Sequence, residues 1–427
     1  MIKILKKYLR KYSWIRKIYR IIKGSVDAGS NVDSFHPTVE EAYQYTPRRC
    51  NQLGHEMRLN LLVPTIDKEY VFGGISTALT FYNEMLKEMN VKKRIIICDI
   101  FKDNSDANTF KDYKVHKNND DSADDFQIVP YCNRLNESFP VGENDIFIAT
   151  GWWTAYSIIP IIKWQAETYN KPKNPLIYLI QDYEPGFYQW SSRHVMAEST
   201  YKSDIPVIAV FNTTLLKDYF LQKNYKFFRE YSFEPCLNKV LKSFLIPNGK
   251  IRKKQILIYG RPFTPRNAFE LIIDALRIWA QKQKDSREWS IISAGEDFPN
   301  VFIQDGQNLK SLGKLTLEEY ATKMLESYAG ISLMISPHPS YPPLEMSTFG
   351  MKVITNSYEN KDLSGFNQNI ISLNSLTPDS VAEELLKLTR AYAENESEFG
   401  YNEQYMTNSN SFDLIIKQIE TDLIQLN

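Results

Sequence analysis

The chain has 427 residues, of which 43% are hydrophobic and 24% are charged, and its 51 Lys and Arg balance its 51 Asp and Glu. A chain of this length is too long to fold around a single hydrophobic core, and its composition is that of a globular protein. We therefore expect two or three globular domains. The first 24 residues carry many basic residues and no acid, so the remainder is mildly acidic, which disfavours a nucleic-acid-binding protein.

The first 24 residues predict a basic amphipathic helix, because apolar residues recur at helical spacing with Lys and Arg between them. Such a helix can lie on an anionic membrane surface, where each basic residue contributes about 1 kcal/mol. A helix that packs in the core or in an oligomer, with a solvated basic face, explains the pattern as well. Residues 25–55 are polar and turn-rich, so we expect an arm and linker, 1–55, ahead of the first domain.

The sequence contains no run of about 18 apolar residues, so it predicts no membrane-spanning helix. Its N-terminus lacks the apolar core and cleavage site of a signal peptide. The four cysteines lie far apart, which argues against a zinc site or a disulfide framework and favours a reducing compartment. We therefore expect a cytoplasmic protein that the basic arm could hold at the inner face of the cell membrane.

Residues 56–248 predict a first domain in which buried parallel strands alternate with amphipathic helices. The acidic run 118–125 within it predicts a solvated loop. The predicted strands are 58–63, 94–100, 145–150, 176–181, 207–210 and 244–247, and the predicted helices are 75–89, 156–169 and 213–223.

Residues 249–405 predict a second domain of the same kind, and residues 406–427 add a helix expected to pack back on the first domain. This alternation predicts an α/β protein with two Rossmann-like, doubly wound domains whose strands end at a shared cleft. The predicted strands are 256–259, 289–293, 309–312, 331–335 and 353–355, and the predicted helices are 268–283, 317–326, 343–349, 378–395 and 411–425.

Charged residues and glycines mark the ends of particular strands. Arg261 and Arg266 follow the first strand of the second domain, and guanidinium groups bind phosphate oxygens in bidentate fashion. Glu345 is expected to open a helix, where it suits a ribose hydroxyl. The pair Gly73-Gly74 follows the first strand of the chain and lets backbone N–H groups approach an anion. A surface salt bridge and an ordinary turn explain these residues as well.

Several motifs together resemble the GT-B glycosyltransferases of the retaining type, and most closely the bacterial rhamnosyltransferase WsaF type. The matching segments are Gly73-Gly74, Gln181-Asp-Tyr-Glu-Pro-Gly-Phe187, Tyr259-Gly-Arg-Pro262, Pro265-Arg-Asn267 and Ser336-Pro-His-Pro-Ser-Tyr-Pro-Pro-Leu-Glu345. The resemblance implies a GT-B fold, a nucleotide-sugar donor, for which the rhamnosyltransferase type indicates dTDP-L-rhamnose, and a glycan or lipid-linked glycan of the bacterial surface as acceptor. No cofactor is required by such enzymes, and no metal ligand is expected.

The resemblance also implies roles for matching residues on the donor side. Arg261 and Arg266 would bind the diphosphate, and Glu345 would hold the ribose. The turn Gly313-Lys314-Leu315 would bind the base, and Gly73, Gly74, Met346 and Ser347 would complete the nucleotide site. Many relatives carry a second Glu eight residues before the first, where this chain has Pro337. The donor sugar would therefore contact His338, Ser340 or Tyr341 instead.

The acceptor side is expected at strand ends of the first domain. Trp152 and Trp153 could stack on a sugar ring, or they could be core residues beneath a helix. Gln181 and Tyr183 would lie beside the acceptor. Asp182 or Glu184 could accept the proton of an acceptor hydroxyl or stabilise a developing oxocarbenium charge, or could cap a helix instead.

Two other functions fit the same sequence. A metal-dependent GT-A transferase needs an acidic pair such as Asp182-Tyr-Glu184. A non-catalytic carbohydrate-binding scaffold at the membrane would bind sugar without nucleotide. The pattern indicates no oligomeric state.

Overall fold

A computed structural model divides the chain into two compact units, residues 1–40 and 41–427. The predicted basic arm lies outside the described residues, as does most of the predicted linker before residue 45. The structure describes residues 39, 41–42, 45–67, 71, 73–102, 110–117, 120–132, 138–245, 252–392, 399–407 and 412–426.

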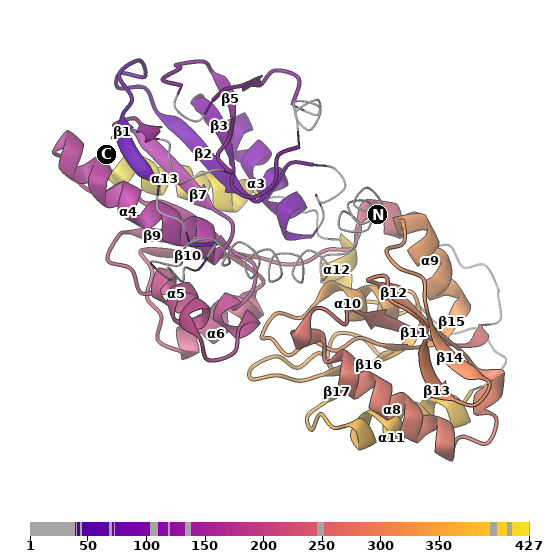
Figure 1. Cartoon of the computed structure of the whole chain (residues 1–427). Helices are drawn as coiled ribbons and strands as arrows, with labels where there is room; N and C mark the ends of the chain where they lie inside the picture. Colours follow the sequence, from indigo (N-terminus) through magenta and orange to yellow (C-terminus); the bar gives the residue numbers. More distant parts are fainter. Residues whose placement is uncertain are drawn as a thin grey trace, which may run out of the picture. The chain divides into compact units, whose positions relative to one another are not determined.

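The first sheet has eight parallel strands in the order β10-β9-β8-β7-β2-β3-β5-β4 (Figure 1). Its six central strands follow the 3-2-1-4-5-6 order of a Rossmann domain, so the chain reverses direction across the sheet between β2 and β7. The strands are β2 (Arg58–Val63), β3 (Lys92–Ile97), β4 (Lys114–Val115), β5 (Phe126–Pro130), β7 (Asp145–Ala149), β8 (Leu176–Ile180), β9 (Val207–Asn212) and β10 (Arg229–Phe233).

Helices cover both faces of this sheet, because alternate side chains of each strand point to opposite sides. Leu62 of β2 joins one core cluster with α4, whereas Leu61 joins the other with α3. Phe412 of the tail packs edge-on against Phe81 of α3, so the final helix belongs to the core of the first sheet. The helices are α3 (Gly74–Glu88), η2 (Glu184–Phe187), α4 (Trp152–Tyr169), α5 (Ser192–Tyr201), α6 (Thr214–Gln222) and α13 (Asp413–Leu426).

A buried ionic network explains why the apolar strands β2 and β3 contain arginines. Arg58 donates two hydrogen bonds of 2.8 Å to Asp145 at the start of β7, and Arg94 contacts the same carboxylate at 3.3 Å. Although burial opposes the charged form, the two guanidinium groups hold the pKa of Asp145 below its usual value. Asn60 donates to Asp145 at 3.1 Å and completes the network. Arg58 and Asp145 are the first residues of β2 and β7, so the network lies at the amino ends of these strands.

The second sheet has seven strands in the order β13-β14-β12-β11-β15-β16-β17, and all pairs are parallel except β13 with β14. Six of them repeat the 3-2-1-4-5-6 order, with the reversal between β11 and β15. The strands are β11 (Lys253–Gly260), β12 (Ser290–Gly295), β13 (Val301–Gln304), β14 (Gln307–Ser311), β15 (Ser327–Ile331), β16 (Lys352–Asn356) and β17 (Ile370–Leu373).

Helices α8 and α11 lie together on one face of the second sheet (Figure 1). The opposite face packs against α9 and α10. Leu237 and Leu241 pack in the same core cluster as α9 and α10. They therefore belong to the core of the second sheet, although the first domain was expected to extend to residue 248. The helices are α7 (Lys239–Lys242), η3 (Pro265–Asn267), α8 (Phe269–Lys282), η4 (Ser286–Glu288), α9 (Leu317–Glu326), α10 (Tyr341–Thr348), α11 (Pro378–Arg390) and α12 (Glu403–Thr407).

The structure confirms the α/β class and most predicted elements, and it corrects several of them. Phe244 lies in a turn after α7, so the predicted strand 244–247 is wrong at its start. Strand β15 ends at Ile331, where the predicted strand began. Within the predicted linker, Thr46–Arg49 forms strand β1, which pairs with β6 (Ser138–Val141). Among the described residues, no helix combines the length and apolarity needed to cross a bilayer.

Candidate functional site

Arg261 and its turn lie at the carboxyl end of β11, beside the reversal point of the second sheet, where ligands bind in open α/β sheets. Glu296, directly after β12, holds this turn. Its carboxylate accepts hydrogen bonds from Arg261 Nε at 3.3 Å, from Phe263 N at 3.1 Å and from Thr264 Oγ1 at 3.3 Å. Arg261 therefore has a defined direction while its guanidinium remains about one-third exposed.

Arg266 follows on the same loop and meets Asp182, which comes directly after β8. The Arg266 Nε atom lies 3.5 Å from Asp182 Oδ2, and the guanidinium carbon lies 4.2 Å from the centre of the Phe187 ring. Burial lowers the pKa of Arg266, while the Asp182 charge opposes this shift. The Arg266 Nε atom is buried and has no hydrogen-bond partner among the described residues. A buried donor of this kind suits an incoming oxygen acceptor.

The segment after β15 brings Ser336, His338 and Ser340 to the same place. Ser336 Oγ hydrogen-bonds Asp182 Oδ1 and also accepts from the His338 backbone N at 3.1 Å. His338 Nδ1 accepts from Ser340 N at 3.0 Å, while Nε2 is buried without a partner among the described residues. Burial lowers the pKa of His338 to about 4. The imidazole is therefore neutral at pH 7, with the Nε2 N–H pointing to no acceptor of the described chain.

Helix α10 begins at Tyr341, and this corrects the expectation that Glu345 opens the helix. The next two residues, Pro342 and Pro343, have no N–H, and the Ser340 N–H is already used by His338. The helix end thus retains its favourable dipole for an anion but offers few free N–H donors. Any diphosphate here would depend chiefly on the two arginines.

Glu345 lies in the second turn of α10 and is half-buried. Burial raises its pKa to about 7, and a nearby Tyr320 hydroxyl opposes this shift. Its two neighbours do not line the site. Met346 is fully buried in the core cluster, and Ser347 is fully buried with its Oγ bonded to Leu344 O and Asn367 Nδ2. Neither side chain therefore reaches a nucleotide in this arrangement, and the prediction that these two residues bind it would rest on their backbone.

The predicted base-binding turn lies beside the same strand ends. Gly313 has φ +65°, a conformation that favours glycine, and its carbonyl accepts from Gly295 N at 3.0 Å. Lys314 is exposed and Leu315 is half-buried. Because Gly295 precedes Glu296, the turn is tied to the loop that holds Arg261.

Gly73 and Gly74 open α3 after β2, at the reversal point of the first sheet. Gly73 has φ +52°, and a Cβ atom on Gly74 would lie 2.6 Å from Gln181 Oε1. Gln181 Nε2 in turn donates to Gly74 O at 2.8 Å. Two segments that lie 107 residues apart are thus in contact, and a Cβ on Gly74 would displace the Gln181 side chain from its present position.

The two tryptophans after β7 have different environments. Trp152 is fully buried and donates from Nε1 to Tyr188 OH at 2.9 Å, so the expectation that its ring stacks on a sugar is wrong. Trp153 is half-buried, with its Nε1 atom unpartnered among the described residues. Glu184 accepts from Trp152 N at 2.5 Å and so caps the start of α4. Burial raises the pKa of Glu184 to about 8.

Tyr183 and Tyr341 connect the site to the surrounding core. The Tyr183 hydroxyl lies 3.1 Å from Tyr225 OH, and its ring packs edge-on against Tyr219 at 5.2 Å. This ring is thus part of an aromatic cluster while the residue stays half-buried, and its place beside the acceptor remains a prediction. Tyr341 donates to Asn212 Oδ1 at 3.0 Å, and burial raises its pKa to about 12.

Sequence reasoning missed two charged residues of the site. Glu296 belongs to no recognisable motif. Its position directly after β12, the strand next to β11, is the one sequence feature that could have indicated a place in the site. Lys361 is fully buried, donates to Met334 O at 2.5 Å, and has its pKa lowered to about 7 by burial, with Asp182 opposing. Asp182 therefore interacts with Arg266, His338 and Lys361 together. Nothing in the local sequence around Lys361 indicates this.

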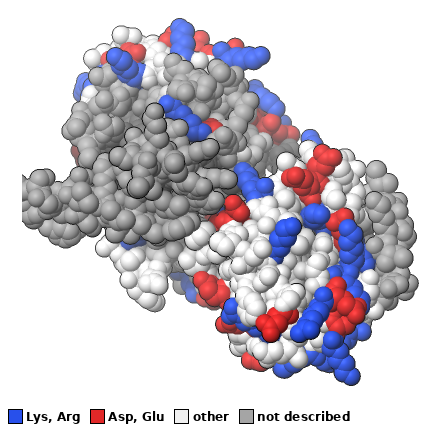
Figure 2. All heavy atoms as spheres, turned by 45° about the vertical axis from the view of Figure 1, so that its right-hand side comes forward, with Lys and Arg blue, Asp and Glu red and all other residues white. Residues whose placement is uncertain are grey.

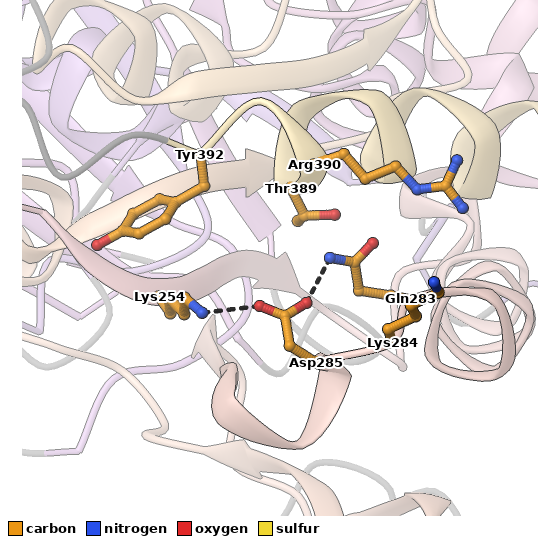
Figure 3. A pocket seen from close by; sticks show the side chains of 7 residues that line it. All are labelled: Lys254, Gln283, Lys284, Asp285, Thr389, Arg390 and Tyr392. Atoms are coloured by element: carbon orange, nitrogen blue, oxygen red, sulfur yellow. Dashed lines mark hydrogen bonds and ion pairs between the residues drawn. The ribbon is translucent and has the colours of Figure 1, made fainter.

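Many charged residues elsewhere on the described surface are paired with one another or lie at helix ends. Lys and Arg alternate with Asp and Glu on the face drawn in Figure 2. A hollow of about 520 Å³ lies at the opposite end of β11 from Arg261 (Figure 3), where Asp285 bonds Lys254 at 2.7 Å and Gln283 at 2.6 Å. Helices α8 and α11 end there, so its basic residues complement two helix C-termini.

Across the described residues no cluster of three His, Cys, Asp or Glu could hold a metal ion.

Two Rossmann-type sheets in one chain are the architecture of the GT-B fold. The solved sucrose-phosphate synthase from Thermosynechococcus elongatus has a similar fold, with a TM-score of 0.51 and 10% identity over 87% of this chain and 99% of that one. The structure of WaaG, a glycosyltransferase involved in lipopolysaccharide biosynthesis, gives a TM-score of 0.49 at 13% identity, over 78% of this chain and 90% of WaaG.

Two family models match consecutive parts of the chain: the WsaF N-terminal domain over residues 58–214 and the WsaF C-terminal domain over residues 254–386. The chain belongs to the WsaF family. It is also 30% identical over 216 residues to the O-antigen biosynthesis protein RfbC of Myxococcus xanthus. That match covers 50% of this chain but only 15% of the relative.

Proposed function

We propose that this protein is a glycosyltransferase that moves L-rhamnose from dTDP-L-rhamnose to a growing glycan of the bacterial surface, either free or lipid-linked. Membership of the WsaF family and the GT-B fold support sugar transfer. The similarity to a protein of O-antigen biosynthesis supports a surface glycan as the acceptor.

One observation carries the proposal: two arginines follow β11, and the buried Nε of one faces a carboxylate at 3.5 Å without forming a hydrogen bond. Arg266 Nε has no hydrogen-bond partner among the described residues, and Arg261 remains partly exposed. A diphosphate bound here would supply acceptors for both guanidinium groups. The same charges would stabilise the negative charge that develops as the sugar–phosphate bond breaks.

The ribose, the base and the sugar of the donor would contact residues that lie beside the two arginines. We propose that Glu345 binds a ribose hydroxyl, and that the turn at Gly313 with Lys314 and Leu315 receives the base. A carboxyl group whose pKa is about 7 can both donate and accept a hydrogen bond near neutrality. The sugar would lie near His338, Ser340 and Tyr341, where the His338 Nε2 N–H could donate to a hydroxyl.

In the proposed reaction the acceptor hydroxyl oxygen bonds to the anomeric carbon while the bond from that carbon to the phosphate oxygen breaks. The diphosphate leaves with the bonding electrons, and Arg261 and Arg266 balance its charge. Asp182 would take the acceptor proton. Where its carboxylate instead stabilises the oxocarbenium-like carbon, the proton would pass to an oxygen of the leaving diphosphate, and in both cases Glu184 would support Asp182 from the start of α4. We propose retention of anomeric configuration from the resemblance to retaining enzymes, and no requirement for a metal ion because side chains supply the positive charge.

The test is nucleotide binding by calorimetry, with dTDP and UDP titrated into the parent protein and into Arg261→Ala. Losing one charge-assisted contact should weaken binding roughly 10- to 100-fold. Arg277→Ala is the matched control, because Arg277 pairs with Asp274 on the exposed side of α8. Transfer from dTDP-L-rhamnose that persists in a chelator would support the metal-free reaction. Sugar binding without any nucleotide binding would instead indicate a non-catalytic scaffold.

The predicted basic arm would add a contact with the inner face of the cell membrane, close to a lipid-linked acceptor. A variant lacking residues 1–24 should then lose sedimentation with anionic vesicles and keep its nucleotide affinity.

A further inference from the structure

Trp190 is the most exposed large apolar side chain among the described residues. Its side chain is 95% exposed, whereas the indole of Trp152 in the same neighbourhood is fully buried. Leaving an indole in water forgoes several kcal/mol of burial free energy, because aromatic side chains bury roughly 150–250 Å² each. With so little of its surface covered, Trp190 contributes little to the folded core. Its exposure therefore needs another explanation.

The indole does not hang freely from the surface, because a histidine lies against it. The Trp190 and His194 ring centres lie 5.3 Å apart at an interplanar angle of 32°. His194 Nδ1 lies 2.9 Å from Pro185 O, and since a carbonyl only accepts, Nδ1 donates and its orientation is held. Ser191, between the two residues, caps α5 by accepting from His194 N. The two rings form a tilted aromatic pair, which we call the Trp190 platform.

The Trp190 platform continues from the candidate site along the chain. It follows η2, whose last residue, Phe187, lies under the Arg266 guanidinium. Trp190 lies three positions after Phe187 in the sequence, so their Cα atoms are at most about 11 Å apart. Tyr188 between them is bonded to Trp152 at the start of α4, which ties the segment to the first sheet.

The surroundings of the platform are polar but carry little charge. Gln189, Ser191 and Ser192 are exposed beside it, and they offer amide and hydroxyl groups. The nearby Arg193 is engaged with Glu41 at 3.0 Å. An aromatic face rimmed by uncharged hydrogen-bonding groups fits the C–H face and hydroxyls of a neutral pyranose. An anionic membrane would require exposed Lys or Arg instead.

We infer that the Trp190 platform binds the acceptor glycan, stacking on a sugar residue of the chain at a distance from the reacting hydroxyl. This inference rests on the proposed function and adds to it, because it places a second acceptor contact outside the candidate site. Such a contact contributes only when the acceptor is long enough to reach it. Long acceptors should therefore be used more efficiently than short ones, and Trp190 should be the cause.

The experiment compares a short and a long rhamnose oligosaccharide as acceptors for the full-length protein with dTDP-L-rhamnose. Trp190→Ala should lower kcat/KM for the long acceptor roughly tenfold, mainly through KM, and leave the short acceptor unchanged. Trp190→Phe should retain part of the preference. Leu414→Ala is the matched control, since Leu414 is 79% exposed on α13. Binding of the long oligosaccharide, measured by calorimetry without donor, should fall in the same order.

Equal effects of Trp190→Ala on both acceptors, or none on either, would overturn the inference while leaving the proposed function intact. A loss of binding to vesicles of phosphatidylcholine and phosphatidylglycerol, with unchanged acceptor kinetics, would overturn it in favour of a membrane contact. If the parent protein transfers no sugar and binds neither dTDP nor UDP, the proposed function fails. The donor-free calorimetry then decides the glycan contact by itself.

Discussion

Replacing Asp182 with Asn should tighten the binding of a nucleotide diphosphate and at the same time slow sugar transfer. The Asp182 carboxylate lies 3.5 Å from Arg266 Nε, so it occupies the guanidinium that a diphosphate would use. It also repels the phosphate charge directly. Asparagine keeps the size of the side chain and can still accept from Ser336 Oγ and from Tyr183 N. The substitution therefore removes charge with little change in shape.

The distance sets the size of the effect. Two unit charges at 3.5 Å attract each other by about 5 kcal/mol at an effective dielectric constant of 20. The Arg266 side chain is 25% exposed, so solvent screens part of this attraction, and the diphosphate also loses some of its own hydration. A net gain on the order of 1 kcal/mol remains, which corresponds to a roughly fivefold lower Kd.

Calorimetric titration of dTDP and UDP into Asp182→Asn and the parent protein measures this gain, and a coupled assay of dTDP release measures transfer. Asp274→Asn is the control, because Asp274 pairs with Arg277 at 3.2 Å away from the site. The gain should shrink at high salt. Unchanged or weaker nucleotide binding in Asp182→Asn would refute the idea that the carboxylate and the diphosphate compete for Arg266. Tighter binding with full transfer activity would refute the catalytic role of Asp182.

Two further predictions concern the carboxyl group and the core of α10. Burial raises the pKa of Glu345 from 4.5 to about 7, so the folded protein binds this proton more tightly than the unfolded chain, and stability falls as the pH rises through this range. Urea unfolding of Glu345→Gln should show a gain in unfolding free energy over the parent above pH 7 that vanishes below pH 4.5. A gain that does not change with pH would contradict the prediction. Met346→Ala should cost about 2–5 kcal/mol of unfolding free energy and leave the nucleotide Kd unchanged, and a selective loss of nucleotide binding would contradict its assignment to the core.

The order of strands and helices was largely predictable because it depends on local patterns. Continuous apolar runs such as Arg58–Val63 and the helical spacing of Leu317–Glu326 reproduce the observed elements. Strands that were missed, such as Phe126–Pro130 and Ile370–Leu373, are short and lie towards the edges of their sheets. Arg261 could be placed at a strand end for the same reason, since strand, turn and charge are adjacent in sequence.

Contacts between distant segments decided the rest of the site. Trp152 is buried where the start of α4 bonds to Glu184 and Tyr188, a contact that no sequence periodicity expresses. Arg266 pairs with Asp182, which lies 84 positions earlier in the sequence. The buried Lys361, which comes later in the sequence than both, interacts electrostatically with Asp182. Local sequence determines which residues follow a strand. The side-by-side order of the strands determines which of these strand ends meet, and hence which charges neutralise one another and which remain for a ligand.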